Sequence, residues 1–316
     1  MHPRLIAGAR LPRWAAGADW PVSAGGVALA DLHLDAGRFV RATPASARDA
    51  HDTAAVGRAA DAVWNVDGAP VLPGLVDAHA HLDKTFTRDR APPLRPGLLG
   101  AIEAMHRDRV GWTAEDVRAR AACALAWAEA AGVVHLRTHV DWWEADRVPL
   151  AWHVLAELAQ DWRGRIALER VALVPLTLYA DADVADRLAG HVREGGAGAC
   201  LGGFVHTVNW NAAALAHLFD AAARHDLDVD LHVDEELSPA ACGLATTAAL
   251  VRERGFGGRV VCGHACALSA QDEATAAATL DAVARAGITL VSSPPPTCCC
   301  RMPCPAARRA GAASPW

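Results

Sequence analysis

The chain has 316 residues, of which 52% are hydrophobic, and its formal net charge is −6. This length suits one large α/β barrel or two domains, and the acidic balance argues against a basic nucleic-acid-binding surface. No uninterrupted apolar stretch reaches the roughly 18 residues of a membrane helix, and the first residues lack the apolar centre of a secretory signal. We therefore expect a cytoplasmic protein that binds neither nucleic acid nor membrane.

Residues 1–70 predict a small β-sandwich subdomain, because short strand-like pieces alternate with Gly, Pro, Asp and Ala. These pieces span residues 27–33, 38–42 and 62–66. From residue 71 to 292 the pattern changes to apolar strands that alternate with long, Ala-rich helical stretches. The predicted strands are 71–76, 133–140, 166–175, 199–206, 227–233, 258–264 and 288–292. The predicted helices are 113–131, 147–161, 181–194, 211–225, 239–254 and 270–286.

Repeated β-then-α units with continuous apolar strands indicate a parallel sheet covered by helices. The seven predicted strands are one fewer than the eight of a (β/α)₈ TIM-type barrel. The predicted fold class is therefore α/β, a barrel of that type that is incomplete at strand eight. A doubly wound sheet is the alternative that the pattern leaves open.

The most informative stretch runs from Val71 to Thr87 and reads VLPGLVDAHAHLDKTFT. Residues i and i+2 of a strand point to the same face, so His79 and His81 can present two imidazoles to one point. Neutral imidazole is the commonest protein ligand for zinc and similar metals. A bare His-x-His would often be chance in a chain with 15 His. The Leu-Pro-Gly before this one and the Leu-Asp-Lys after it make it specific.

Histidines and acids also stand at the ends of four later predicted strands. They are His139 with Asp141, His206, His232 with Asp234 and Glu235, and His264. The functional groups of α/β barrels lie at the C-terminal ends of the strands, so we expect these side chains at one rim. This coincidence carries more weight than any single motif.

Three nitrogens, from His79, His81 and His232, could hold one divalent metal and leave a position for water, as catalytic sites do. A bound metal lowers the pKa of its water and so generates hydroxide near neutral pH. Glu235 could then shuttle a proton, and His264 could hydrogen-bond the hydroxide or the developing tetrahedral centre. Taken alone, His232 or His264 would more often be an ordinary histidine at a strand end.

Other candidates each have two interpretations. Lys84 could contact substrate or could pair with Asp83, and His206 is a candidate substrate contact. Three further residues could contact the metal ligands and fix their orientation, or could have a structural role only: His139, Asp141 and Asp234.

Together these motifs resemble those of the amidohydrolase superfamily. The segment LPGLVDAHAHLD, from Leu72, is similar to its opening motif. RTHVD from Arg137, DLHVDE from Asp230 and GHA from Gly263 resemble the cytosine deaminase branch in particular. The resemblance covers about residues 70–292 and implies a (β/α)₈ barrel with a β-sandwich built from both chain ends. It also implies one Zn²⁺ or Fe²⁺ and hydrolytic removal of an amine from a small nitrogen heterocycle.

Carried over by motif, the resemblance makes His79, His81 and His232 the metal ligands. It makes Glu235 the proton shuttle to the ring nitrogen and His264 the contact to the hydrolytic water. No lysine follows the third or fourth predicted strand, where members with two metals carry a carboxylated lysine. This absence favours a single metal.

The third predicted strand ends differently from that of cytosine deaminases. There a Pro-Gln pair lets the glutamine amide read the pyrimidine edge, whereas here Pro175 is followed by Leu176. An apolar side chain cannot pair with a polar ring edge, so Leu176 in a substrate-binding position would change the specificity. A triazine or an isocytosine-like ring is then as good a candidate as cytosine, and hydrolysis of a cyclic amide is the alternative reaction.

The last metal ligand of the superfamily, an aspartate after strand eight, has no counterpart in the sequence. Residues 293–316, SPPPTCCCRMPCPAARRAGAASPW, contain no acid and show no periodicity, and their adjacent cysteines make a poor zinc site. Codons for residues 297–316 exist that, read one nucleotide over, encode the family-like LLLQDAVPGRTPRWRGVTL. We interpret residues 293–316 as a non-native or disordered tail produced by a frameshift. We expect the chain as written to be poorly stable and nearly inactive, an inactive truncated form, and the full-length form to be able to form a homo-oligomer.

Overall fold

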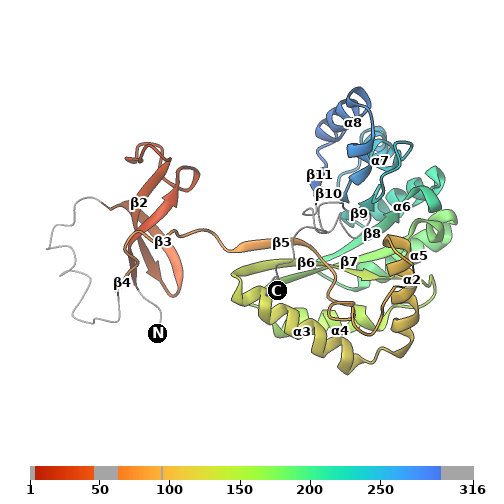
Figure 1. The fold of residues 1–316 in the computed structure, drawn as a ribbon, viewed down its shortest axis with the longest axis horizontal. Coiled ribbons are helices and arrows are strands. Elements are labelled where there is room, and N and C mark those ends of the chain that lie inside the picture. Colours follow the sequence, from red (N-terminus) through yellow and green to blue (C-terminus); the bar gives the residue numbers. More distant parts are fainter. Residues whose placement is uncertain (1–3, 46–62, 94, 293–316) are drawn as a thin grey trace. The chain divides into compact units, whose positions relative to one another are not determined.

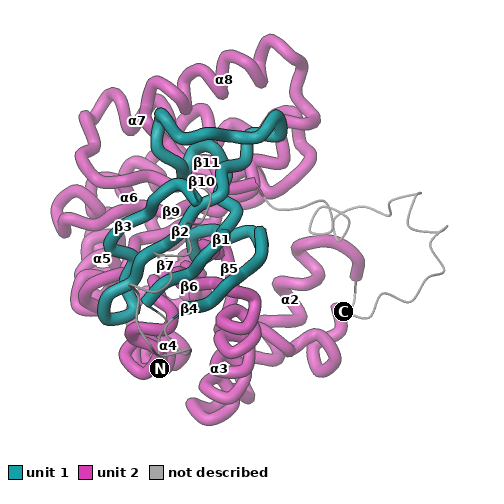
Figure 2. The backbone as a smooth tube through the Cα atoms, turned by 90° about the vertical axis from the view of Figure 1, so that its left-hand side faces the viewer, with its two compact units in different colours: residues 1–74 teal, residues 75–316 magenta. Residues whose placement is uncertain are grey.

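A computed structural model describes residues 4–45, 63–93 and 95–292 (Figure 1). The chain divides into two compact units at Gly74–Leu75, each with its own sheet (Figure 2). The expected boundary was residue 70. The expected tail, residues 293–316, lies outside the described residues, and so does the frameshift hypothesis that concerns it. In the described part, no helix has the length and apolar character needed to cross a membrane.

The first unit holds a four-stranded sheet in the order β3-β2-β1-β4. Its strands are β1 (Leu5–Pro12), β2 (Val27–Asp35), β3 (Arg38–Pro44) and β4 (Val63–Asn65). The sequence patterns missed β1, which pairs antiparallel with β2 and parallel with β4. Ala9 and Leu11 of β1 pack with Ala30 and Leu32 of β2 in a small core of their own.

The second unit is built on a seven-stranded sheet in which each strand pairs in parallel with the next one along the chain. This consecutive order is that of a barrel, because a doubly wound sheet reverses its strand order part-way. The strands are β5 (Leu75–Ala80), β6 (Val133–Asp141), β7 (Ala167–Pro175), β8 (Ala199–Val205), β9 (Val229–Val233), β10 (Val260–His264) and β11 (Thr289–Val291).

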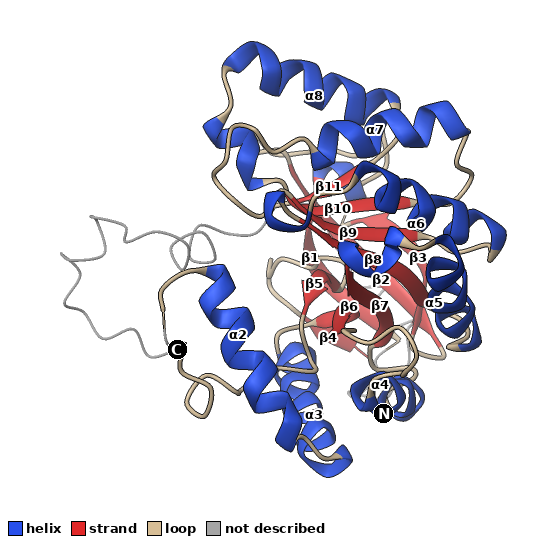
Figure 3. Cartoon of the chain, turned by 90° about the vertical axis from the view of Figure 1, so that its right-hand side faces the viewer, coloured by secondary structure: helices blue, strands red, loops and turns tan. Residues whose placement is uncertain are grey.

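Of the helices in this unit, all but the first lie around the outside of the sheet (Figure 3). The helices are α2 (Leu98–Asp108), α3 (Ala114–Ala130), α4 (Leu150–Asp161), α5 (Ala182–Glu194), α6 (Ala212–Arg224), α7 (Gly243–Arg254) and α8 (Glu273–Arg285). Four of them begin at a side chain that accepts a hydrogen bond from the first turn, as good N-caps do: Thr113, Asp181, Asn211 and Asp272. The sequence patterns missed α2, whose N-cap is Gly97 and has no capping side chain.

The sheet is strongly curled. β5 and β10 are separated by four strands in the sheet order, yet the rings of His79 and His264 lie 4.6 Å apart between centroids. The central strands are buried on both faces, as residues 171–174 of β7 show, and the main core fills the space between sheet and helices. The predicted α/β barrel is therefore confirmed, with seven strands in the described residues and the C-terminal ends of β5 and β10 facing one another.

Candidate metal and substrate site

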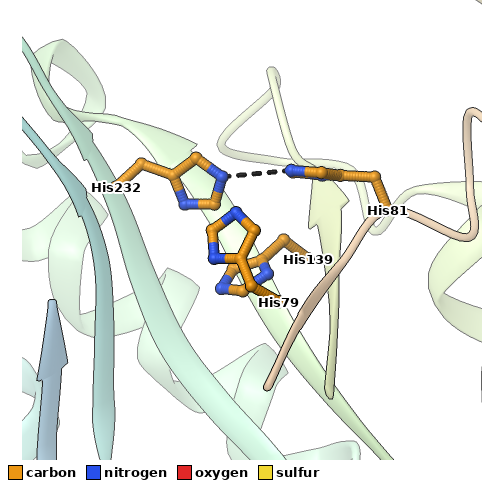
Figure 4. Close-up of side chains that lie close together, drawn as sticks. All are labelled: His79, His81, His139 and His232. Carbon is orange, nitrogen blue, oxygen red and sulfur yellow. Dashed lines mark hydrogen bonds between the residues drawn. The ribbon is translucent and has the colours of Figure 1, made fainter. Parts of the chain in front are cut away.

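Histidines from three strands meet at the C-terminal end of the sheet (Figure 4). His79 lies in β5 and His81 directly follows that strand, while His232 lies in β9. The ring centroids of His79 and His232 are 4.5 Å apart, and the Nε2 atoms of His81 and His232 are 3.2 Å apart. With His139 of β6, one ring nitrogen of each of these four histidines lies within 4.8 Å of the others. The structure thus brings together all three residues that the sequence predicts as ligands.

This donor set fits one divalent cation. Two nitrogens bound at about 2.0–2.1 Å to a tetrahedral zinc are about 3.3 Å apart, which is close to the separation of the two Nε2 atoms. Burial lowers the pKa of His81 and of His232 well below 6.5, so both rings are neutral at pH 7. The neutral ring is the form that binds a metal.

His139 lies among these rings, and its side chain is fully buried. Its Nε2 atom is 3.1 Å from Oδ1 of Asp230, and Nη1 of Arg137 donates a hydrogen bond of 2.8 Å to Oδ2 of the same carboxylate. Carboxylates that hydrogen-bond a histidine in this way fix the orientation of its ring. The sequence analysis named His139 as a supporting residue but missed Arg137 and Asp230, although both stand in the motifs that it quoted.

Glu235 and His264 face the clustered histidines from the ends of β9 and β10. His264 Nδ1 is 3.4 Å from Glu235 Oε1, and both side chains are almost fully buried. Burial lowers the pKa of His264 to about 4, so its ring is neutral at pH 7. The backbone φ is +51° at Asp234 and +73° at His264. Non-glycine residues rarely adopt this left-handed conformation, and it often occurs at functional sites.

Lys84 and Asp141 form an ion pair beside the histidines. Nζ of Lys84 donates to Oδ1 of Asp141 at 2.6 Å, so Lys84 pairs with Asp141 and not with Asp83. Asp83 instead accepts a hydrogen bond of 3.0 Å from the backbone N–H of Asp141. Burial alone would lower the pKa of Lys84, but Asp141 and Asp83 outweigh it and raise this pKa above 10.5, so the ammonium keeps its charge.

Three candidates occupy other places. Asp234 accepts hydrogen bonds of 3.0 and 2.9 Å from the first two backbone N–H groups of α7, and so caps that helix. His206 is directed toward Glu236, with 3.2 Å between Nδ1 and Oε1. Leu176 is fully buried in the main core and does not line the cavity described next.

One cavity of about 430 Å³ joins His79, His81 and His232 to Glu235, His264 and the Lys84–Asp141 pair. Its remaining wall is apolar and is formed by Leu98, Ala101, Ile102, Met105, Trp143, Leu173, Pro175 and Phe204, with Ala80. The first four belong to α2, and their spacing places them on one face of that helix. Sequence analysis missed this wall, although the spacing could have revealed it. The volume is that of a small-molecule site.

No family model matches the chain. Over 225 residues the chain is 40% identical to the pterin deaminase of Rhizobium rhizogenes (strain K84 / ATCC BAA-868), a match that covers 71% of this chain and 51% of that protein. The structure is similar to that of 5-methylcytosine deaminase from Klebsiella pneumoniae, with a TM-score of 0.76, 26% identity, and 92% of this chain and 66% of that chain covered. These similarities in sequence and structure indicate the deaminase-like branch of the amidohydrolase superfamily.

A further protein of similar structure is N-isopropylammelide isopropylaminohydrolase from Burkholderia multivorans ATCC 17616. Its TM-score is 0.67 and its identity 26%, with 91% of this chain and 67% of that chain covered. These matches confirm the resemblance to the deaminase-like branch of the amidohydrolase superfamily. The chain spans about half the length of the curated relative that it matches.

Proposed function

We propose that the protein is a metal-dependent hydrolase that removes the amine from an amino-substituted nitrogen heterocycle. The observation that carries this proposal is the cluster of four imidazoles within 4.8 Å of one another, with Glu235 and His264 facing the same cavity. The relatives support it, because two of those compared are named as deaminases and a third as an aminohydrolase.

The proposed reaction exchanges one bond at a ring carbon for another. A divalent cation, Zn²⁺ or Fe²⁺, held by His79, His81 and His232, would lower the pKa of a water molecule and supply hydroxide at neutral pH. As the new C–O bond forms, Glu235 takes up the proton and delivers it to the ring nitrogen. His264 hydrogen-bonds the oxygen that adds to the ring. The second proton of the water, still on the added oxygen, then passes to the amine, the C–N bond breaks, ammonia leaves, and the ring carbon keeps the oxygen as a carbonyl.

The cavity suits a flat heterocycle with apolar faces and polar edges. Its aromatic and aliphatic wall, with Trp143, Phe204 and one face of α2, can cover the faces of a ring while the polar groups contact its edges. At about 430 Å³ it is large enough for a fused two-ring compound. We therefore place a pterin first, since the curated relative is named a pterin deaminase, with isocytosine and aminated triazines next.

The test is ammonia release by the purified full chain, supplied with Zn²⁺ or Fe²⁺, from pterin, isocytosine and an aminated triazine. The Glu235→Gln variant should lose at least about 10²-fold in activity. The matched control is Glu253→Gln, an exposed position in α7 that should keep the parent rate. Release of ammonia by the Glu235→Gln variant at the parent rate would contradict the proposal, and no release by the metal-loaded parent would instead match the inactive form that the sequence analysis expects. Ring opening without ammonia would show hydrolysis of a cyclic amide in its place.

A further inference from the structure

The charged side chains of the cavity fall into two groups. Glu235 stands with the metal-binding histidines and His264, on the side where we place the reaction. Among the described residues that line the cavity, the only other charged side chains are Lys84 and Asp141. The mechanism uses neither of them. Leu176, which the sequence analysis considered for reading the substrate, does not line the cavity, so recognition of a polar ring edge falls to this pair.

Lys84 is the only lysine of the chain, since the other 29 of its 30 basic residues are arginine. A composition that so strongly favours arginine makes a lysine at this position informative. The ammonium is a compact group with three donors, whereas a guanidinium is a larger planar fork. The cavity wall therefore carries the compact ammonium of a lysine, whereas every other basic residue of the chain is an arginine with its larger guanidinium.

The pair is held in place before any ligand arrives. Arg120 Nη1 donates hydrogen bonds to the carbonyl oxygens of Asp83 and Thr85, at 2.7 and 3.0 Å, and so fixes the backbone on both sides of Lys84. The side chain of Asp141 is bound by Lys84, and its backbone N–H by Asp83. Groups fixed in advance lose little entropy when a ligand binds, which is the usual design of a recognition site.

A purely structural role explains the pair less well. Side-chain exposure is 22% for Lys84 and 9% for Asp141, so both reach the cavity surface. Burying two charges costs several kcal/mol that their attraction only partly offsets, and apolar residues of similar size would often stabilise the fold as well or better. A charged pair on the wall of a mostly apolar cavity is therefore best explained by a ligand with a matching polar edge.

We propose that Lys84 and Asp141 recognise the lactam edge of the substrate, that is, a ring carbonyl next to a ring N–H. Nζ of Lys84 donates to the carbonyl oxygen, and the carboxylate of Asp141 accepts from the N–H. This inference rests on the proposed function and narrows its substrate class to aminated lactams, such as a 2-amino-4-oxo ring. A 2,4-diamino ring presents an amine where Lys84 needs an acceptor and has no ring N–H for Asp141, so neither side chain gains the hydrogen bond that the lactam supplies.

The kinetic test compares pterin, which has the lactam, with 2,4-diaminopteridine, which lacks it, on the metal-loaded full chain. The parent should prefer pterin in kcat/KM by about 10²-fold or more. Lys84→Met and Asp141→Asn should each raise KM for pterin and reduce this preference to less than about a tenth of the parent value. Lys84→Arg should recover it only in part, because the fork does not reproduce the ammonium.

The matched control is Arg259→Met, which removes the cation of the exposed Arg259–Asp228 pair and should leave the preference unchanged. Metal content and unfolding, measured on every variant, separate a lost contact from a lost fold. Unchanged preference in a folded, metal-loaded Lys84→Met variant would overturn the inference.

A second measurement does not depend on turnover. Because Lys84 is the only lysine, labelling with ¹⁵N-lysine gives a single side-chain ammonium signal in NMR spectra of the whole chain. Lumazine, the dioxo ring that keeps the lactam, should shift this signal, and 2,4-diaminopteridine at the same concentration should not. Equal shifts by both compounds, or no shift by lumazine, would overturn the inference. If the signal responds as expected but no compound releases ammonia, the recognition site stands and the proposed deamination fails.

Discussion

Replacement of Arg137 by methionine should destabilise the barrel strongly, because it leaves the buried carboxylate of Asp230 without its cationic partner. Asp230 is 1% exposed, and Arg137 Nη1 is 2.8 Å from its Oδ2 atom. Arg137 Nε also donates to Glu169 at 2.7 Å, so a single guanidinium balances two acids inside the barrel. After the substitution, His139 alone would contact Asp230.

Removal of one partner from a buried ion pair costs about 3–5 kcal/mol, because the other charge stays buried without compensation. For a unit of this size each kcal/mol lowers Tm by about 2–4 °C. The Arg137→Met variant should therefore melt about 6–20 °C below the parent. A double variant with Asp230→Asn should melt higher than the single variant, because it removes the stranded charge as well as its partner.

The assay is thermal unfolding followed by circular dichroism, on metal-free protein, so that loss of metal does not enter the result. Arg118→Met is the matched control, because Arg118 also bridges two acids, Glu157 and Asp161, but is 40% exposed. Exposed pairs contribute about 0–1 kcal/mol, so this control should melt within a few degrees of the parent. Equal losses for Arg118→Met and Arg137→Met would refute the reasoning.

Two further predictions concern single residues at the rim. Asp234→Ala should remove the cap of α7 and lower the free energy of unfolding, measured in urea, by about 0.5–2 kcal/mol. The metal content should stay unchanged. Loss of the metal in this variant would instead make Asp234 part of the metal-binding site. Burial lowers the pKa of His264 to about 4 in the folded chain, compared with about 6.5 in the unfolded chain. Between these pH values the unfolded state binds more protons than the folded state. The free energy of unfolding therefore falls as the pH falls. Summed over this range, His264 should contribute about 3 kcal/mol, so the His264→Asn variant should show a flatter dependence of unfolding free energy on pH than the metal-free parent. Parallel curves for the two proteins would contradict the neutral, buried state of this ring.

The barrel was predictable because its signals are local and repeated. Buried parallel strands are continuous apolar runs, and the helices between them begin at capping residues such as Thr113 and Asp181. The convergence of histidines was predictable for a topological reason, since parallel strands carry their C-terminal residues to one edge. Strand bounds were less accurate at β5, where the chain stays extended to Ala80, four residues beyond the predicted end.

The rest of the site depends on tertiary contacts that leave weak local signals. Helix α2 lacks a capping side chain and follows a proline-rich segment, so the apolar wall that it supplies was missed. Arg137 and Asp230 lie 93 residues apart and meet only inside the barrel. Leu176 was placed at the substrate because it follows Pro175 where cytosine deaminases have a glutamine, but its side chain is fully buried in the core.

Metal binding tests the central claim most directly. Inductively coupled plasma mass spectrometry of the full chain, equilibrated with Zn²⁺ and freed of excess metal, should find about one equivalent per chain. The His79→Ala/His81→Ala/His232→Ala variant should bind almost none, whereas His153→Ala, at an exposed position of α4, should bind as the parent does. A full equivalent of metal in the folded triple variant, or none in the folded parent, would contradict the account.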